Sequence, residues 1–320
     1  MELKIFSGTA NRPLAEDICR ELGVPLGNAL IGTFKNGETR VKIEEHVRGA
    51  DVFVIQPTSS PGDHNIMELL IMIDALMRAS AGRITAVVPY YGYAKQEKKT
   101  SGREPISAKL VANLIVTAGA NRVVAVDLHA PAIQGFFDIP VDNLTAIPIL
   151  AESLRTYDPH HIVVVSPDSG GVARATQFND RIGAGLAFIA KQRPEPDVAT
   201  VLNVVGNVRG KTAIIVDDMI STGGTLVEAA GRLCELGAKE VMAYAVHPVL
   251  AGNATELIAQ SNLTRVVVTN TIPVPPEDRN GKITVINIAW LIAEAIRRIH
   301  EGTSVSALFQ ATHFRQEPLI

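Results

Sequence analysis

Short runs of β-branched and other apolar residues alternate with amphipathic segments along the chain. Apolar runs of this length are typical of strands that are buried on both faces of a parallel sheet. We predict strands of this kind at residues 51–55, 83–88, 122–126, 161–165, 212–216, 240–246 and 265–268.

The segments between these strands carry apolar residues at helical spacing. In residues 65–79 this spacing follows Asp63, a plausible helix cap, and Gly82 lies beyond its end. Residues 110–117 and 226–236 show the same spacing and also end near a glycine. This alternation predicts an α/β fold, in which mainly parallel sheets are flanked by helices on both faces.

A short internal match suggests that this arrangement occurs twice. Residues 118–129 align without a gap with residues 236–247, and the same offset places Ser107 on Thr225. Two related α/β domains would explain the match, although any helix, Gly-Ala turn and strand would look similar.

The domain boundary is predicted after the irregular stretch at 135–143. We therefore place the domains at residues 1–144 and 145–300. The segment from about 301 to 320 could pack back on the first domain, but no sequence pattern decides this.

Composition narrows the classes of protein to consider. A hydrophobic fraction of 47% over 320 residues suits a soluble globular chain with roughly two domains. The net charge of −3 gives no broad basic field for nucleic acid, so any anion site must be local. Neither a membrane span nor a leader pattern occurs, and we expect a cytoplasmic location. The isolated Cys19 and Cys234 are interpreted as packing residues.

The segment 211–225 carries the most informative chemistry. An apolar run leads to the paired acids Asp217 and Asp218, and a loop of small residues then opens a helix. This loop contains Ser221, Thr222, Gly223, Gly224 and Thr225. The two glycines permit close backbone approach, so that successive N–H groups can converge on a phosphate at the positive end of the helix.

The paired acids suit a sugar beside that phosphate. Carboxylates at the carboxyl end of a strand can accept hydrogen bonds from vicinal hydroxyls, and ligands of open α/β sheets bind at this edge. A tight strand-to-helix turn with a threonine cap is the structural alternative. The two adjacent acids in register with the small residues favour the ligand site.

Two other predicted strand ends carry candidate ligands. His129 follows one strand and Asp168 follows another, so both could meet a magnesium nucleotide. Mg²⁺ prefers oxygen ligands, which suits Asp168 better than His129, and a lone histidine is often structural. No P-loop sequence occurs, so ATP would be held by other means.

These segments resemble known proteins. The loop at 211–225 resembles the phosphoribosyl pyrophosphate loop of the type I phosphoribosyltransferase fold. Over nearly its whole length the chain resembles the phosphoribosyl pyrophosphate synthetase family (ribose-phosphate diphosphokinases). The matching stretches are 5–8, 34–38, 65–73, 89–99, 105–113, 127–130, 134–144, 166–168, 211–225 and 268–272.

The resemblance implies two phosphoribosyltransferase-like domains, an activity and a set of site residues. The activity is transfer of the terminal diphosphate of ATP to ribose 5-phosphate with Mg²⁺ as cofactor, and a homo-oligomer, often a hexamer, shares the adenine site between subunits. ATP binding falls to Phe34, Asn36, Gly37, Glu38, Lys95, Gln96 and His129, metal binding to His129 and Asp168, and catalysis to Lys191 and Arg193. Ribose 5-phosphate binding falls to Arg193, Asp217, Asp218, Ser221, Thr222, Gly223, Gly224 and Thr225.

Two positions depart from the usual family pattern. Lys95 stands where arginine is usual, which loses a planar fork for phosphate, and Ser221 stands where aspartate is common. Regulation by phosphate or ADP is not implied, because it differs between family classes. A phosphoribosyltransferase and a non-catalytic regulatory homologue are the alternative functions. The nucleotide motifs disfavour the first alternative, and the retained Lys191 and Arg193 disfavour the second.

Overall fold

The chain forms two compact units in a computed structural model that describes residues 1–192 and 201–310. The first unit contains Met1–Thr145, Thr271–Pro273 and residues 288–310. The second contains Ala146–Asn270 and Val274–Asn287.

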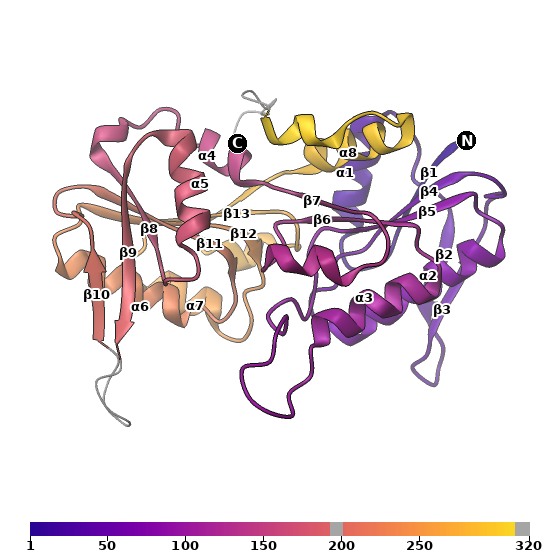
Figure 1. Cartoon of the computed structure of the whole chain (residues 1–320), viewed down its shortest axis with the longest axis horizontal. Coiled ribbons are helices and arrows are strands. Elements are labelled where there is room, and N and C mark those ends of the chain that lie inside the picture. Colours follow the sequence, from indigo (N-terminus) through magenta and orange to yellow (C-terminus); the bar gives the residue numbers. More distant parts are fainter. Residues whose placement is uncertain (193–200, 311–320) are drawn as a thin grey trace. The chain divides into compact units, whose positions relative to one another are not determined.

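The first unit is an α/β layer structure. Its elements are β1 (Leu3–Ser7), α1 (Arg12–Leu22), β2 (Ala29–Thr33), β3 (Thr39–Ile43), β4 (Asp51–Ile55), α2 (Gly62–Arg78), β5 (Arg83–Val88), α3 (Ser107–Ala118), β6 (Arg122–Val126), η1 (Pro131–Phe136), β7 (Val141–Leu144), α8 (Ala289–Glu301) and η4 (Val305–Gln310). Among the described residues, the main sheet has the order β1-β4-β5-β6-β7 with every neighbouring pair parallel. Figure 1 shows α1 and α8 on one face of this sheet and α2 and α3 on the other.

The core of the first unit forms where strand side chains pack against helix α2. Val52 and Val54 belong to one buried cluster with Leu69 and Ile73 of α2. Strands buried on both faces need no polar alternation, which explains the continuous apolar runs in the sequence. Burying each such side chain contributes about 1.5–3 kcal/mol to folding.

The second unit repeats this layering. Its elements are α4 (Ile147–Glu152), η2 (Pro159–His161), β8 (Ile162–Ser166), α5 (Val172–Ile182), β9 (Gly185–Gln192), β10 (Val201–Val205), β11 (Thr212–Ile220), α6 (Gly224–Glu235), β12 (Glu240–Pro248), α7 (Ala254–Gln260), β13 (Arg265–Thr269), η3 (Pro276–Arg279) and β14 (Ile283–Ile286). Within the described ranges the sheet order is β10-β9-β8-β11-β12-β13-β14, parallel except for β10 against β9. In Figure 1, α4 and α5 lie on one face of the sheet and α6 and α7 on the other.

The internal match corresponds to equivalent places in the two sheets. The matched strands are β6, which lies between β5 and β7, and β12, which lies between β11 and β13. The helices that precede them, α3 and α6, follow β5 and β11. The loop after β5 is therefore the topological counterpart of the glycine loop after β11.

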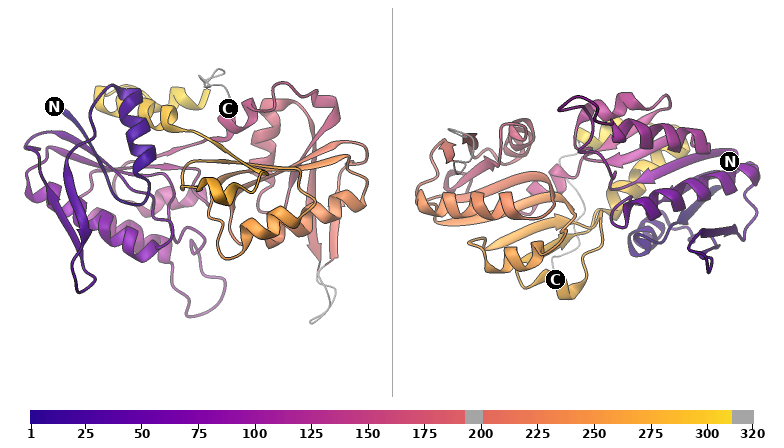
Figure 2. Two further views of the ribbon diagram at one scale, coloured as in Figure 1. Left: turned by 180° about the vertical axis from the view of Figure 1, so that it is seen from behind. Right: turned by 90° about the horizontal axis from the view of Figure 1, so that it is seen from below.

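Helix α8 belongs to the first unit, although the predicted second domain ran to residue 300. It packs beside α1 (Figure 2, left), and its buried face includes Leu291, Ile292 and Ile296. Arg83 donates to the carbonyl of Ile299 at 3.0 Å. The assignment differs because long-range packing, which leaves no local signal, decides where a C-terminal helix docks.

Two further details differ from the sequence prediction. Strand β7 occupies part of the stretch that was expected to be irregular, where the polar Asp142 pairs with Arg122 across to β6. Helix α2 starts at Gly62, so that Asp63 lies in its first turn and accepts a hydrogen bond from the Tyr93 hydroxyl. None of the described helices is long and apolar enough to cross a lipid bilayer.

Candidate functional site

The paired acids lie inside strand β11 and not beyond its end. The strand continues past the predicted limit at Val216, because β12 remains paired with it as far as Ile220, opposite Pro248. The Asp217 side chain is 36% exposed and that of Asp218 only 4%.

Arg174, in the first turn of α5, contacts both acids. Its Nη1 atom lies 3.2 Å from Asp217 Oδ1 and 3.3 Å from Asp218 Oδ1. Burial raises the pKa of Asp217 to about 7, the neighbouring Asp218 adds to the rise, and Arg174 opposes it. At the carboxyl end of β11, the positive charge of Arg174 therefore opposes the effects of burial and of the second acid on Asp217.

Backbone hydrogen bonds fix the start of the loop after β11. The N–H groups of Leu250 and Ala251 donate to the carbonyls of Ile220 and Ser221, each at 2.9 Å. Gly223 has φ of 79°, a conformation that favours glycine, and no side chain caps the helix that follows it in the described structure. Because Thr222, Gly224 and Thr225 are exposed, hydroxyl and N–H donors border an accessible helix start.

Asp168 lies in the turn between β8 and α5. Its Oδ1 atom accepts the N–H of Gly171 at 2.9 Å, and its carbonyl accepts from the Ser166 hydroxyl at 2.7 Å. The residue is exposed at the carboxyl end of a strand that pairs with β11. The structure therefore brings Asp168 to the same sheet edge as the acid pair.

The predicted catalytic pair is only partly covered by the structure. Lys191 has a strand backbone in β9, paired with Leu202, but its side chain lies outside the described residues. Arg193 also lies outside them.

The first unit carries Lys95 and Gln96 on the loop after β5. Both are exposed, and the Gln96 amide oxygen accepts from Ser107 at the start of α3. Thr58 braces the beginning of this loop, since its N–H donates to the Tyr90 carbonyl at 2.9 Å and its hydroxyl accepts from the Gly92 N–H at 2.6 Å.

The end of the same loop is also fixed. Glu104 accepts hydrogen bonds from the hydroxyl and N–H groups of Ser101 and Thr100 at 2.7 to 2.9 Å. These donors, the Ser101 hydroxyl first, lower the pKa of Glu104 to about 2. The carboxylate is thus ionised throughout the physiological range.

His129 follows β6, the next strand of that sheet. The turn before it is fixed by Asp127, which has φ of 39° and accepts from the Thr145 hydroxyl at 2.9 Å. Because β5 and β6 are parallel neighbours, His129 and Lys95 belong to the same sheet edge.

The remaining predicted nucleotide ligands occupy the turn of the β2–β3 hairpin. All of Phe34, Asn36, Gly37 and Glu38 are exposed, and Asn36 Oδ1 accepts from the Glu38 N–H at 3.3 Å. The Arg40 guanidinium lies over the Phe34 ring at 5.6 Å. Phe34 as a residue is 49% exposed, which is unusual for so apolar a side chain.

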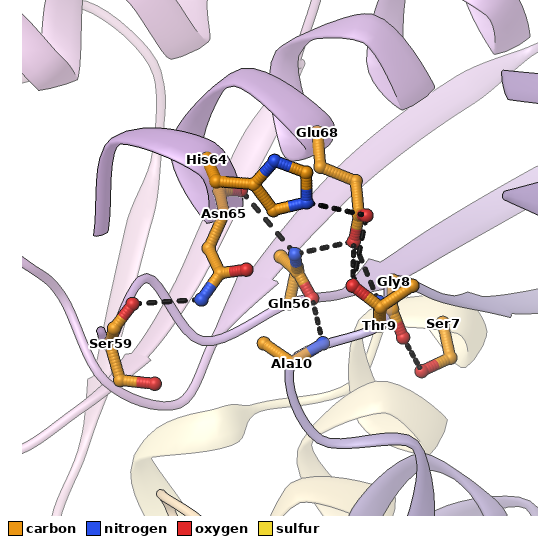
Figure 3. Close-up of polar contacts among 9 residues, drawn as sticks. All are labelled: Ser7, Gly8, Thr9, Ala10, Gln56, Ser59, His64, Asn65 and Glu68. Carbon is orange, nitrogen blue, oxygen red and sulfur yellow. Dashed lines mark hydrogen bonds and ion pairs between the residues drawn. The ribbon is translucent and has the colours of Figure 1, made fainter. Parts of the chain in front are cut away.

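A buried polar network lies at the carboxyl ends of β1 and β4 (Figure 3). The Glu68 carboxylate accepts from the Thr9 N–H at 2.6 Å, from the Thr9 hydroxyl and from Gln56 Nε2 at 2.7 Å. Gln56 Oε1 in turn accepts from the Ala10 N–H at 3.1 Å. These contacts fix the loop after β1 against helix α2.

Sequence reasoning missed Arg174 and this network. A cation in the first turn of a helix opposes the helix dipole, so Arg174 could have been recognised as a residue that needs an acidic partner. The network depends on residues far apart in sequence and gave no comparable signal. Among the residues described, no group of three or more His, Cys, Asp and Glu side chains forms a metal site.

Comparison with known proteins places these features in a family. The family model "N-terminal domain of ribose phosphate pyrophosphokinase" matches residues 3–119, and "Phosphoribosyl synthetase-associated domain" matches residues 192–310.

Curated relatives match over nearly the whole chain. The ribose-phosphate pyrophosphokinase of Bacillus cereus is 54% identical over 307 residues, which cover 96% of this chain and 97% of the relative. That of Bacillus subtilis is 53% identical with the same coverage. The crystal structure of phosphoribosylpyrophosphate synthetase from Mycobacterium smegmatis has a TM-score of 0.90 at 47% identity, covering 94% of this chain and 100% of that one. The chain therefore belongs to the ribose-phosphate pyrophosphokinase family.

Proposed function

We propose that the protein is an ATP-dependent ribose-phosphate diphosphokinase. It transfers the β,γ-diphosphate of ATP to the anomeric hydroxyl of ribose 5-phosphate and gives 5-phosphoribosyl 1-diphosphate and AMP. The observation that carries the proposal is the pairing of two acids with an open glycine turn at the carboxyl end of β11, in a chain of this family.

The sugar phosphate would occupy the β11 edge. Asp217 and Asp218 accept hydrogen bonds from the two vicinal ribose hydroxyls. The donors of Ser221 to Thr225 bind the 5-phosphate at the start of α6, where the helix dipole favours an anion. This division places the anomeric hydroxyl away from the phosphate group, where it can react.

The nucleotide would be held by the other predicted ligands. The hairpin turn with Phe34, Asn36, Gly37 and Glu38 would contact adenine, while Lys95, Gln96 and His129 contact the nucleotide from the sheet edge. In this family the adenine site is expected to be shared with a neighbouring subunit of a homo-oligomer, with a hexamer as the expected state.

Magnesium fits the side chains that are present. Mg²⁺ takes one or two carboxylates and completes its shell with water and phosphate oxygens, and the exposed Asp168 carboxylate supplies such a ligand. When bound, the ion offsets charge on the phosphate oxygens of the nucleotide. We assign Asp168 and His129 to this metal–nucleotide site.

The chain's own residues would position the reactants and balance charge. The oxygen of the anomeric hydroxyl bonds to the β-phosphorus, the bond from that phosphorus to the bridging α,β-oxygen breaks, and AMP leaves. Lys191 and Arg193 would offset the charge that spreads over the phosphoryl oxygens, and Arg193 would also contact ribose 5-phosphate. Positioning and electrostatics provide most of the catalysis in phosphoryl transfer.

The product would feed nucleotide biosynthesis, and we expect the enzyme to act in the cytoplasm. Neither nucleic acid nor a membrane is expected as a partner.

An assay of the pure protein tests the proposal. With ATP, Mg²⁺ and ribose 5-phosphate present, we expect AMP and the diphosphorylated sugar in equal amounts. Chelation of Mg²⁺ should stop both, and excess Mg²⁺ should restore them. A protein that binds ATP but forms no AMP would support the regulatory homologue. Activity only with phosphoribosyl pyrophosphate and a base would support a phosphoribosyltransferase.

A further inference from the structure

The first turn of helix α5 holds a cation where helix electrostatics disfavour one. Arg174 is the third residue of α5, and the N-terminal end of a helix carries partial positive charge. Helical side chains also lean toward the N-terminus, so this guanidinium reaches back to the end from which the helix starts. A contact outside the helix must therefore stabilise the guanidinium in this position.

The acid pair of β11 supplies that contact. One nitrogen, Nη1, lies within 3.3 Å of a carboxylate oxygen on each acid, and the Arg174 side chain is only 18% exposed. Asp217 Oδ1 also accepts the N–H of Asp218 at 2.8 Å. The same guanidinium nitrogen thus contacts both carboxylates.

We propose that Arg174 is a positioning residue for ribose 5-phosphate, which orients Asp217 and Asp218 toward the sugar's vicinal hydroxyls and favours their ionised forms. This inference rests on the proposed function. The guanidinium does not contact the reacting atoms; it acts through the two carboxylates.

The charges around the pair explain why a cation is required. Two adjacent carboxylates in a partly buried site disfavour each other's ionisation. On β12 the residue in register with Asp217 is the uncharged Ala245, and His247 lies opposite Met219. On β8 the residues in register with β11 are Ile162 to Val165, and Asp168 follows that strand.

The other groups near the acids do not replace the Arg174 charge. The remaining charged residues of α5, Asp180 and Arg181, lie in its last turns, and the described β9 side chains up to Ala190 are uncharged. Within the described residues, Arg174 is the cation that the structure pairs with both acids.

The effect of Arg174 on pH dependence has a definite sign. The Asp217 carboxylate must be ionised to accept the hydroxyl hydrogens, so binding of the sugar weakens as pH falls through the pKa of Asp217. Burial, followed by the neighbouring Asp218, raises the pKa of Asp217 to about 7, and Arg174 opposes this rise. Removing the guanidinium raises that pKa, and the loss of binding then begins at a higher pH.

The test compares Arg174→Gln with the parent enzyme. We expect the KM for ribose 5-phosphate to rise about tenfold or more, with the KM for ATP within about twofold. The acidic limb of kcat/KM for ribose 5-phosphate should move upward by about one pH unit. Calorimetric titration with ribose 5-phosphate, without ATP, should show the same loss of affinity.

Two further variants control this comparison. Arg232→Gln removes a guanidinium from an exposed pair with Glu235 on α6, and it should leave every parameter at the parent value. Arg174→Lys keeps the charge, so its acidic limb should stay at the parent pH while its KM for ribose 5-phosphate rises less than that of Arg174→Gln.

The outcomes separate the two proposals. No AMP from the parent enzyme defeats the proposed function. An active parent whose Arg174→Gln variant keeps its KM for ribose 5-phosphate and its acidic limb defeats the inference alone. If Arg174→Gln does not fold, Arg174→Lys decides: an unchanged KM for ribose 5-phosphate, or an equal rise in the KM for ATP, overturns the positioning role.

Discussion

Gly8, in the first unit, has no room for a side chain. A Cβ atom at this position would lie 2.7 Å from Glu68 Oε1 and closer still to the Gln56 side-chain amide. Both side chains are buried and hydrogen-bonded to the loop after β1 (Figure 3). Neither can move without leaving a buried polar group unsatisfied.

The variant Gly8→Ala should therefore lose about 2–4 kcal/mol of unfolding free energy, by overpacking and by loss of one or more buried hydrogen bonds. Urea denaturation followed by circular dichroism measures the change. Gly62→Ala is the matched control, because a Cβ there meets open space at the start of α2. A Gly8→Ala protein as stable as Gly62→Ala would show that the network tolerates rearrangement.

Lys191 is proposed to offset charge at the reacting phosphate, so its removal should affect turnover more than binding. Lys191→Ala should leave the affinities for ATP and ribose 5-phosphate within a fewfold of the parent and lower kcat by about 10²–10⁴-fold. Steady-state kinetics and equilibrium titration measure the two effects separately. The exposed Lys239→Ala serves as control, and near-normal turnover of Lys191→Ala would refute the role.

Helix α8 is tied to the sheet of the first unit through one buried carboxylate. Asp51 lies at the start of β4. Its Oδ1 accepts from Arg83 Nε at 2.7 Å, and its Oδ2 accepts from Arg83 Nη2 at 2.5 Å. His300 Nδ1 lies 2.8 Å from the same Oδ2 atom. Asp51 is 1% exposed, so these hydrogen bonds offset the cost of burying its carboxylate. Two neighbouring strands and the C-terminal helix therefore meet at a single side chain.

Asp51→Asn should lower the unfolding free energy by about 2–4 kcal/mol, because Arg83 loses a bidentate partner in a site that water reaches poorly. The urea midpoint at pH 7 measures the loss. Asp74→Asn makes the same chemical change in an exposed pair with Arg78 and should alter stability by less than about 0.5 kcal/mol. Equal effects of the two substitutions would argue against the special position of Asp51.

At the scale of the whole molecule, we expect a neighbouring subunit to complete the proposed adenine site. The exposed Phe34 ring and its hairpin turn would complete the site of another copy. Phe34→Ala and Lys191→Ala would each be nearly inactive alone, since every site then lacks one component.

Co-expressed with two different tags and purified as mixed oligomers, the same two variants should regain about a quarter of parent activity, because some sites combine an intact Phe34 with an intact Lys191. AMP formation by the doubly purified sample measures this recovery. Separately purified variants kept apart provide the control. Mixed oligomers without recovery would place Phe34 in the site of its own subunit.

The sequence by itself determined the strands and helices of the two sheets and the residues whose chemistry suits a ligand site. Its buried parallel strands appear as apolar runs because both faces are covered, and the glycine loop after β11 is a local pattern of strand, turn and helix start. The strands from β4 to β6 and the acid pair were therefore predictable. These signals depend on neighbours in sequence.

Only the tertiary structure decided which distant residues meet. It placed Arg174 on the paired acids, Glu68 on the loop after β1, and α8 on the first unit. It also extended β11 through the acids, because β12 offered continued pairing up to Ile220. Each of these depends on packing between segments far apart in the chain, and no local pattern of apolar and polar residues specifies such a partner.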